Sequence, residues 1–114
     1  MSNRTYTNRR YLDALADHVV IFDGAMGTSI QRYNLTAADY GGEHLNGCVD
    51  YLVITRPDVI GEIHASFLSV GSEVVETNTF RSNRWTLGEY GLGDRTLEIN
   101  RAAAKLARSI CDRF

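Results

Sequence analysis

Residues 18–28 have the sequence HVVIFDGAMGT, and this stretch indicates the fold class. Its first five residues form an apolar, β-branched run, which is typical of a strand covered on both faces. The hexapeptide at 23–28 contains two glycines, which reach backbone conformations closed to other residues. It therefore predicts a tight turn from a strand into a helix that continues to about Tyr33.

A second apolar segment further along the chain predicts another strand. Residues 72–77 (SEVVET) form this strand, and residues 78–80 (NTF) close it. A helix is predicted before it, because Thr55-x-x-Asp58 is a variant of the capping box with proline in the first turn. This helix is expected to end at Gly71. Its apolar residues fall at near-helical spacing: Val59, Ile63, Phe67 and Val70.

The remaining segments are mostly helical or irregular. Residues 1–10 are polar, and we expect a disordered or frayed end. Short helices are predicted over 11–17 and 81–90, and Asp94 is the expected N-cap of a last helix. Residues 34–51 show no period and predict a long loop, which in compact domains is usually functional or mobile. The apolar face of the last helix consists of Ile99, Ala103, Leu106 and Ile110.

The order of the predicted elements is strand, helix, long loop, helix, strand, helix, helix. Strands that alternate with helices indicate an α/β fold with a parallel sheet. Two strands do not complete such a sheet, because parallel sheets are covered on both faces and two-stranded sheets are not independently stable. We therefore expect residues 11–114 to be the opening of a larger domain, incomplete at its C-terminal end.

The composition excludes several classes of function. With 114 residues, 44% hydrophobic and 23% charged, the chain is typical of at most one soluble domain. A formal net charge of −2 gives no uniform positive field for nucleic acid or an anionic membrane. The longest apolar runs are about four residues, far below the ~20 of a membrane span. We expect a cytoplasmic protein with no nucleic-acid or membrane partner.

Polar residues follow both predicted strands, where reactive groups gather in parallel α/β folds. An aspartate that leaves a strand before a glycine has its carboxylate beside exposed backbone N–H groups. Asp23 would then bind an ammonium, and the amides of Gly24 and Ala25 would bind a carboxylate, so the turn suits a zwitterion. The alternative is that Asp23 caps the following helix, since aspartate is a favoured N-cap.

The residues after the second strand are open to two interpretations as well. Asn78 and Thr79 either orient a polar ligand at the same rim or form a turn that satisfies its own backbone. Glu76 interrupts an apolar strand and must be hydrogen-bonded, paired or solvated. It supports the site or forms a structural ion pair. His64, at the margin of an apolar helix face, is expected to pack in the interior.

Other chemistries lack part of their motif. His44-x-x-x-Cys48 would need a third metal ligand, and Cys111 is expected to act as a small hydrophobe, so no zinc site can be assembled. Neither GxGxxG nor GxxxxGK[ST] occurs. A haloacid-dehalogenase-like phosphatase would show DxDGT, but Ala25 stands where its second carboxylate should be. A phosphate-handling α/β enzyme is therefore the weaker alternative.

The chain closely resembles the N-terminal part of the homocysteine-binding (homocysteine S-methyltransferase) domain of cobalamin-dependent methionine synthases. The resemblance covers about residues 11–114 and implies a (β/α)8 TIM barrel, of which this chain would supply about two βα units plus extra helices. Such a barrel takes ~250 residues. The motifs that carry the resemblance occur in order: DGAMGT (23–28), RPDVI (56–60), IH (63–64), ETNTF (76–80) and INRAAAKLAR (99–108).

The resemblance also implies an activity. In that family a methyl group passes from methylcobalamin, recharged from methyltetrahydrofolate, to the zinc-bound thiolate of homocysteine, giving methionine. A metal suits this step because a free thiol has a pKa of ~8.5 and only the thiolate is a good nucleophile. The family's substrate aspartate corresponds to Asp23, and its amide contacts to Gly24 and Ala25. Asn78 and Thr79 match the second-strand motif and are expected to line the pocket.

The family's zinc cysteines, one single and one adjacent pair, lie on later strands and are expected beyond Phe114. Neither Cys48 nor Cys111 corresponds to them, so no metal ligand or catalytic residue is expected in this chain. Its expected partners are homocysteine, the rest of the barrel, and the folate and cobalamin domains of the parent enzyme. We expect the isolated chain to be inactive. The alternative is a non-catalytic truncated fragment stabilised by association, which exposed strand edges would favour.

Overall fold

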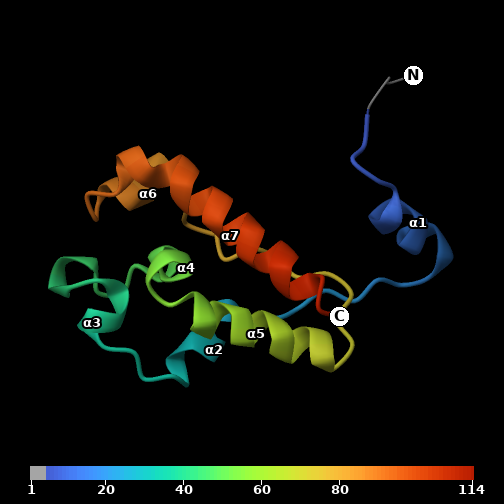
Figure 1. Cartoon of the computed structure of the whole chain (residues 1–114), viewed down its shortest axis with the longest axis horizontal. Coiled ribbons are helices and arrows are strands. Elements are labelled where there is room, and N and C mark those ends of the chain that lie inside the picture. Colours follow the sequence, from blue (N-terminus) through green and yellow to red (C-terminus); the bar gives the residue numbers. More distant parts are fainter. Residues whose placement is uncertain (1–4) are drawn as a thin grey trace.

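The computed structural model describes residues 5–114, which form mostly short helices (Figure 1). None of the helices in this range is both long and apolar enough to cross a bilayer. The predicted frayed end over 1–10 falls partly outside the described residues. In chain order the elements are α1 (Arg10–Asp17), α2 (Met26–Gln31), α3 (Ala37–Tyr40), the 3-10 helices η1 (Glu43–Leu45) and η2 (Val49–Tyr51), α4 (Leu52–Thr55), α5 (Pro57–Ser69), α6 (Arg84–Gly88), the 3-10 helix η3 (Gly93–Arg95) and α7 (Thr96–Cys111).

Helices α5 and α7 form the centre of the molecule and pack against each other and against α4 (Figure 1). Ile60 on α5 and Ile99 on α7 are completely buried. Gly61 lets the two helices approach closely, because a Cβ at this position would lie 3.3 Å from Cδ1 of Ile110. Burial of an aliphatic side chain of this size stabilises the fold by roughly 1.5–3 kcal/mol. The core is therefore a helical layer.

The predicted helices are confirmed, but two of the predicted caps are wrong. The N-cap of α5 is Arg56, and the buried hydroxyl of Thr55 has no hydrogen-bond partner in the described chain. The Asp58 carboxylate instead accepts two hydrogen bonds from Arg56, and paired, charge-assisted bonds of this kind outcompete a cap. Asp94 lies inside η3, and α7 begins after Arg95 without a side-chain cap.

The two predicted strands lie side by side and parallel, but neither continues as a strand within residues 5–114. Phe22 and Val74 form a single parallel bridge, and the Glu73 N–H donates to the Ile21 carbonyl at 2.8 Å. Val19 is 86% exposed. A parallel sheet requires neighbouring strands and cover on both faces, and the described chain supplies neither here. The (β/α)8 barrel therefore stays a prediction.

The prediction of a long loop over residues 34–51 is wrong. This segment contains α3, η1 and η2 and contributes to the core. Helix α3 begins with a capping box formed by Thr36 and Asp39, and it ends at Gly41, whose φ of 106° favours glycine. Four hydrophobic side chains of residues 34–51 are buried: Tyr40, Leu45, Cys48 and Tyr51.

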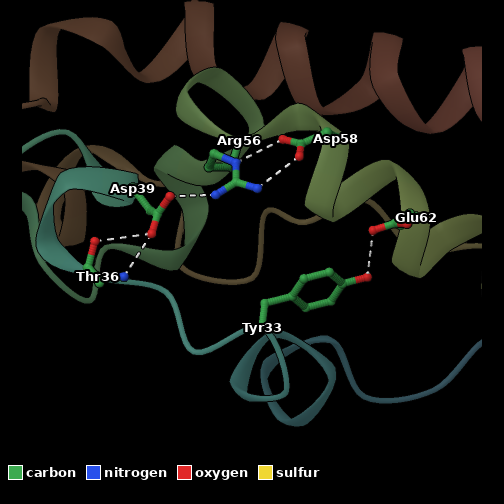
Figure 2. A network of polar contacts seen from close by, with 6 residues as sticks. All are labelled: Tyr33, Thr36, Asp39, Arg56, Asp58 and Glu62. Carbon is green, nitrogen blue, oxygen red and sulfur yellow. Dashed lines mark hydrogen bonds and ion pairs between the residues drawn. The ribbon is translucent and has the colours of Figure 1, made fainter.

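Arg56 connects α3 to the first turn of α5 (Figure 2). Its guanidinium pairs with Asp39 on one side and with Asp58 on the other, the latter with Nη2 2.9 Å from Oδ2. The pKa of Asp39 is lowered by the Thr36 backbone N–H and then by Arg56, and the pKa of Asp58 is lowered by Arg56. Both carboxyl groups are thus more acidic in the folded chain than in the unfolded one.

We expect this network to make stability depend on pH below about 4. The folded pKa values of Asp39 and Asp58 lie below the usual 3.8, so the unfolded chain binds more protons in this range. The stabilisation is present above the unfolded value and is lost as the pH falls through the folded values. Arg56→Met lacks the positive charge of this network. Between pH 7 and pH 3, its free energy of unfolding should fall less than that of the wild type, as measured by urea unfolding at pH 7, 4 and 3.

The matched control is Arg108→Met, because Arg108 forms an exposed ion pair with Asp112 at the end of α7. Exposed pairs contribute little to stability, so this variant should keep the wild-type pH dependence. An Arg56→Met variant with the same acid dependence as the wild type would show that the Arg56 network does not contribute to folding stability.

Candidate functional site

Asp23 lies at the end of the Phe22–Val74 bridge and is held by the second apolar segment. Its backbone N–H donates to the Val74 carbonyl at 3.0 Å, and its Oδ2 accepts from the Glu76 N–H at 3.1 Å. Its other oxygen, Oδ1, is buried and has no hydrogen-bond partner among residues 5–114. A desolvated oxygen without a donor is costly, so Oδ1 of Asp23 is an unused hydrogen-bond acceptor.

Asp23 does not cap the following helix, so the capping interpretation is wrong. Helix α2 begins at Met26, its N-cap is Ala25, and no side chain bonds to its first turn. The carboxylate reaches across to Glu76 instead. The Glu76 side chain is exposed, and it is the backbone of this residue that supports Asp23. The ligand interpretation of Asp23 stays a prediction.

Gly24 and Ala25 expose their backbone next to this carboxylate. Neither N–H donates a hydrogen bond to another residue of the described chain. One carboxylate acceptor and two N–H donors therefore occur in three successive residues. An ammonium group pairs with a carboxylate acceptor, and a carboxylate group pairs with N–H donors. Such charge-assisted bonds are about twice as strong as neutral ones.

Helix α5 supports the turn by direct packing. A Cβ on Gly24 would lie 3.0 Å from Cε1 and 3.1 Å from Cζ of Phe67, closer than ordinary contact. The Tyr33 hydroxyl, just beyond α2, donates to Glu62 of α5 at 3.0 Å (Figure 2). The turn is thus held between α5 and the second apolar segment.

Gly24→Ala is expected to lower the free energy of unfolding by roughly 1–3 kcal/mol, because the added methyl group must displace the Phe67 ring. Gly27→Ala is the matched control in the same motif, since a Cβ there meets nothing within 4 Å. Alanine replaces glycine inside α2, so this control should stabilise by about 0.5–1 kcal/mol. Thermal and urea unfolding measure both. Equal effects of the two changes would contradict the packing of Gly24 on Phe67.

Asn78 and Thr79 follow Glu76, which contacts Asp23, and so belong to the same end of the bridge. Asn78 is 7% exposed, and its Nδ2 donates to the Val49 carbonyl at 2.9 Å. The Thr79 N–H donates to the Thr77 carbonyl at 2.9 Å, so this turn satisfies its own backbone, as one of the two interpretations predicted. Both residues make structural contacts here, and their role in lining a pocket stays a prediction.

Asp50 is a residue near the site that the sequence did not single out. It is buried, its Oδ1 accepts from the Arg81 N–H at 3.2 Å, and burial raises its pKa. Together with the bond from Asn78 to Val49, this contact fixes residues 78–81 against η2. No sequence pattern distinguishes such a carboxylate, because its partner is a backbone N–H distant in the sequence.

The described residues do not fit a zinc site. No three His, Cys, Asp or Glu side chains of residues 5–114 come together as possible ligands. Cys48 is buried, and burial raises the pKa of its thiol, whereas zinc binds the thiolate. Cys111 is half-buried and free on α7. Residues 5–114 therefore do not provide the ligands for a catalytic zinc ion.

The family profile and the individual relatives that match this chain agree on one family. Residues 20–114 match the sequence profile of homocysteine S-methyltransferases. Methionine synthase of Mycobacterium tuberculosis (strain ATCC 25618 / H37Rv) is 42% identical over 101 residues, which are 89% of this chain. Methionine synthase of Mycobacterium leprae (strain TN) is 41% identical over 101 residues, again 89% of this chain. The chain spans 8% of the length of each of these two relatives.

Proposed function

This chain belongs to the homocysteine S-methyltransferase family, and from that premise we propose that its 23–25 turn binds the amino-acid end of homocysteine. Asp23 takes the ammonium, and the N–H groups of Gly24 and Ala25 take the carboxylate. The observation that carries the proposal is the buried Asp23 Oδ1 without a partner, next to two N–H groups that are also unpaired in the described chain.

The expected affinity follows from these contacts. Hydrogen bonds to charged groups contribute roughly 1.5–3 kcal/mol each. Three such contacts to a small zwitterion, less the free-energy cost of immobilising the ligand, correspond to a dissociation constant on the order of 1 mM, since 1 mM equals about −4.1 kcal/mol. The turn would thus hold the amino-acid end of the substrate without contributing to its sulfur chemistry.

The reaction that we propose for the whole enzyme is the conversion of homocysteine to methionine. The methyl donor is methylcobalamin, recharged from methyltetrahydrofolate on other domains, and zinc would supply a homocysteine thiolate at neutral pH. The zinc ligands are proposed to lie outside residues 5–114, in the rest of a (β/α)8 barrel that includes the Phe22–Val74 bridge. The residues of this chain bind and orient the amino-acid end of homocysteine. We therefore propose that the isolated chain transfers no methyl group.

The proposal is tested by titrating the ¹⁵N-labelled chain with L-homocysteine under reducing conditions. We expect the amide signals of Gly24 and Ala25 to shift, with a dissociation constant near the millimolar range. Two matched ligands each lack one charged group: 4-mercaptobutanoate lacks the amine, and 3-aminopropanethiol lacks the carboxylate. Each should bind at least about tenfold more weakly, because each loses at least one charge-assisted contact. Equal binding of all three, or no shift at these amides, would refute the proposal.

A further inference from the structure

His64 is a buried polar side chain in the middle of α5. It is 0% exposed, and neither Nδ1 nor Nε2 has a hydrogen-bond partner in the described chain. A buried polar group without a partner costs about 1–3 kcal/mol, and an apolar residue would avoid this cost. Packing alone therefore does not explain a histidine at this position.

His64 lies on the same face of α5 as a residue that packs against the turn after Asp23. Phe67 lies one turn later on the same face of α5, and its ring meets the position where Gly24 would carry a Cβ. Burial lowers the pKa of His64, and the Asp23 carboxylate acts against this by raising it. The imidazole is consequently neutral near pH 7, with one N–H donor and one nitrogen acceptor.

Buried polar atoms of complementary type therefore occur on two elements that pack together, α5 and the turn after Asp23. The imidazole has an unused N–H, and Asp23 has an unused acceptor in Oδ1. The two do not form a hydrogen bond in the ligand-free chain, and bonds of this kind often tighten only when substrate binds. Each carboxylate oxygen can accept two hydrogen bonds, so Oδ1 can serve His64 and a ligand ammonium together.

We propose that His64 is a positioning residue, whose ring N–H donates to Oδ1 of Asp23 and orients this carboxylate toward the ammonium of the amino-acid substrate. The inference rests on the proposed function of Asp23. A neutral donor is suited to this role because it fixes the carboxylate without neutralising its charge. A cationic partner would compete with the ammonium for the same oxygens.

The first test compares substitutions of His64 in the homocysteine titration. His64→Leu removes the donor, and we expect five- to tenfold weaker binding, with a stability equal to or above that of the wild type. His64→Gln and His64→Asn keep an N–H near the Nε2 and Nδ1 positions, and at least one should restore binding to within about twofold. Ile63→Leu, a conservative change on the same helix, should bind as the wild type does.

The second test follows the ¹⁵N signals of the His64 ring, first without ligand. We expect these signals to change in Asp23→Asn, because this variant removes the carboxylate charge that acts on the ring. When homocysteine binds the wild type, we expect one dominant neutral tautomer. Ring signals that respond to neither Asp23→Asn nor homocysteine, together with unchanged homocysteine affinity in His64→Leu, would overturn the proposal. If the ring responds to Asp23→Asn while homocysteine fails to bind the wild type, the His64–Asp23 contact is supported and the proposed function fails.

Discussion

Asp23→Asn is expected to weaken homocysteine binding by about tenfold to a hundredfold and to leave the free energy of unfolding nearly unchanged. Asparagine has the same shape, and its carbonyl oxygen can still accept the Glu76 N–H that holds Asp23 in place. It lacks the negative charge that pairs with the ammonium, a contact that contributes roughly 1.5–3 kcal/mol. Every 1.4 kcal/mol corresponds to a factor of about ten in affinity.

The matched control is Glu76→Gln. Glu76 contacts Asp23 through its backbone, and its own carboxylate is exposed, so this variant removes a nearby charge without touching the proposed contact. We expect at most a twofold change in affinity. The two affinities are measured by the same amide titration, and urea unfolding checks stability. Wild-type affinity in Asp23→Asn, or an equal loss in both variants, would contradict the assignment of Asp23 as the ammonium ligand.

Ile99→Ala is expected to have the largest effect on stability, lowering the free energy of unfolding by about 2–5 kcal/mol. Ile99 is completely buried on the face of α7 that belongs to the helical core. Its truncation removes apolar contact and leaves a cavity that the neighbouring helices fill only in part. Because small domains have only about 5–15 kcal/mol of total stability, such a loss should be visible as a large shift of the urea midpoint.

Leu97→Ala on the same helix is the control, because Leu97 is 68% exposed. We expect a change within about 0.5 kcal/mol. Val19→Ala, in the exposed first apolar segment, should behave in the same way. Similar effects of Ile99→Ala and Leu97→Ala would contradict the conclusion that the α5–α7 layer, and not the paired extended segments, holds the described chain together.

Most helices, including the short α1, α2 and α6, were predictable from the sequence, whereas the short elements within residues 34–51 were not. Helices α5 and α7 have apolar residues at helical spacing over three or more turns. The elements within residues 34–51 have three or four residues each, too few for a period to show. A usable pattern was nevertheless present at Thr36-x-x-Asp39, which does form a capping box. The similar pattern at Thr55-x-x-Asp58 does not, because Arg56 binds the aspartate.

The direction and pairing of the two extended segments were predictable, but their extent was not. Apolar runs at 18–22 and 72–77 predicted parallel neighbours, and the Phe22–Val74 bridge agrees with this. The length of a strand depends on the strands beside it, which the sequence of the segment itself does not encode.

For the candidate site, the motif indicated where Asp23 lies, at the end of an extended segment. It did not indicate the partner of Asn78, a backbone carbonyl 29 residues away. The missing partners of His64 were equally hidden, because the apolar spacing of α5 predicts burial and says nothing about hydrogen bonds. Contacts that depend on tertiary packing were thus the part that sequence patterns left open.

A crystal structure of the chain with bound L-homocysteine tests the central claim most directly. We predict the ligand's ammonium nitrogen at about 2.7–3.2 Å from the Asp23 carboxylate, with the ligand carboxylate accepting the N–H groups of Gly24 and Ala25. Homocysteine bound elsewhere, for example in the open groove beside Tyr11, Glu73 and Arg108, with the Asp23 carboxylate unoccupied, would contradict it.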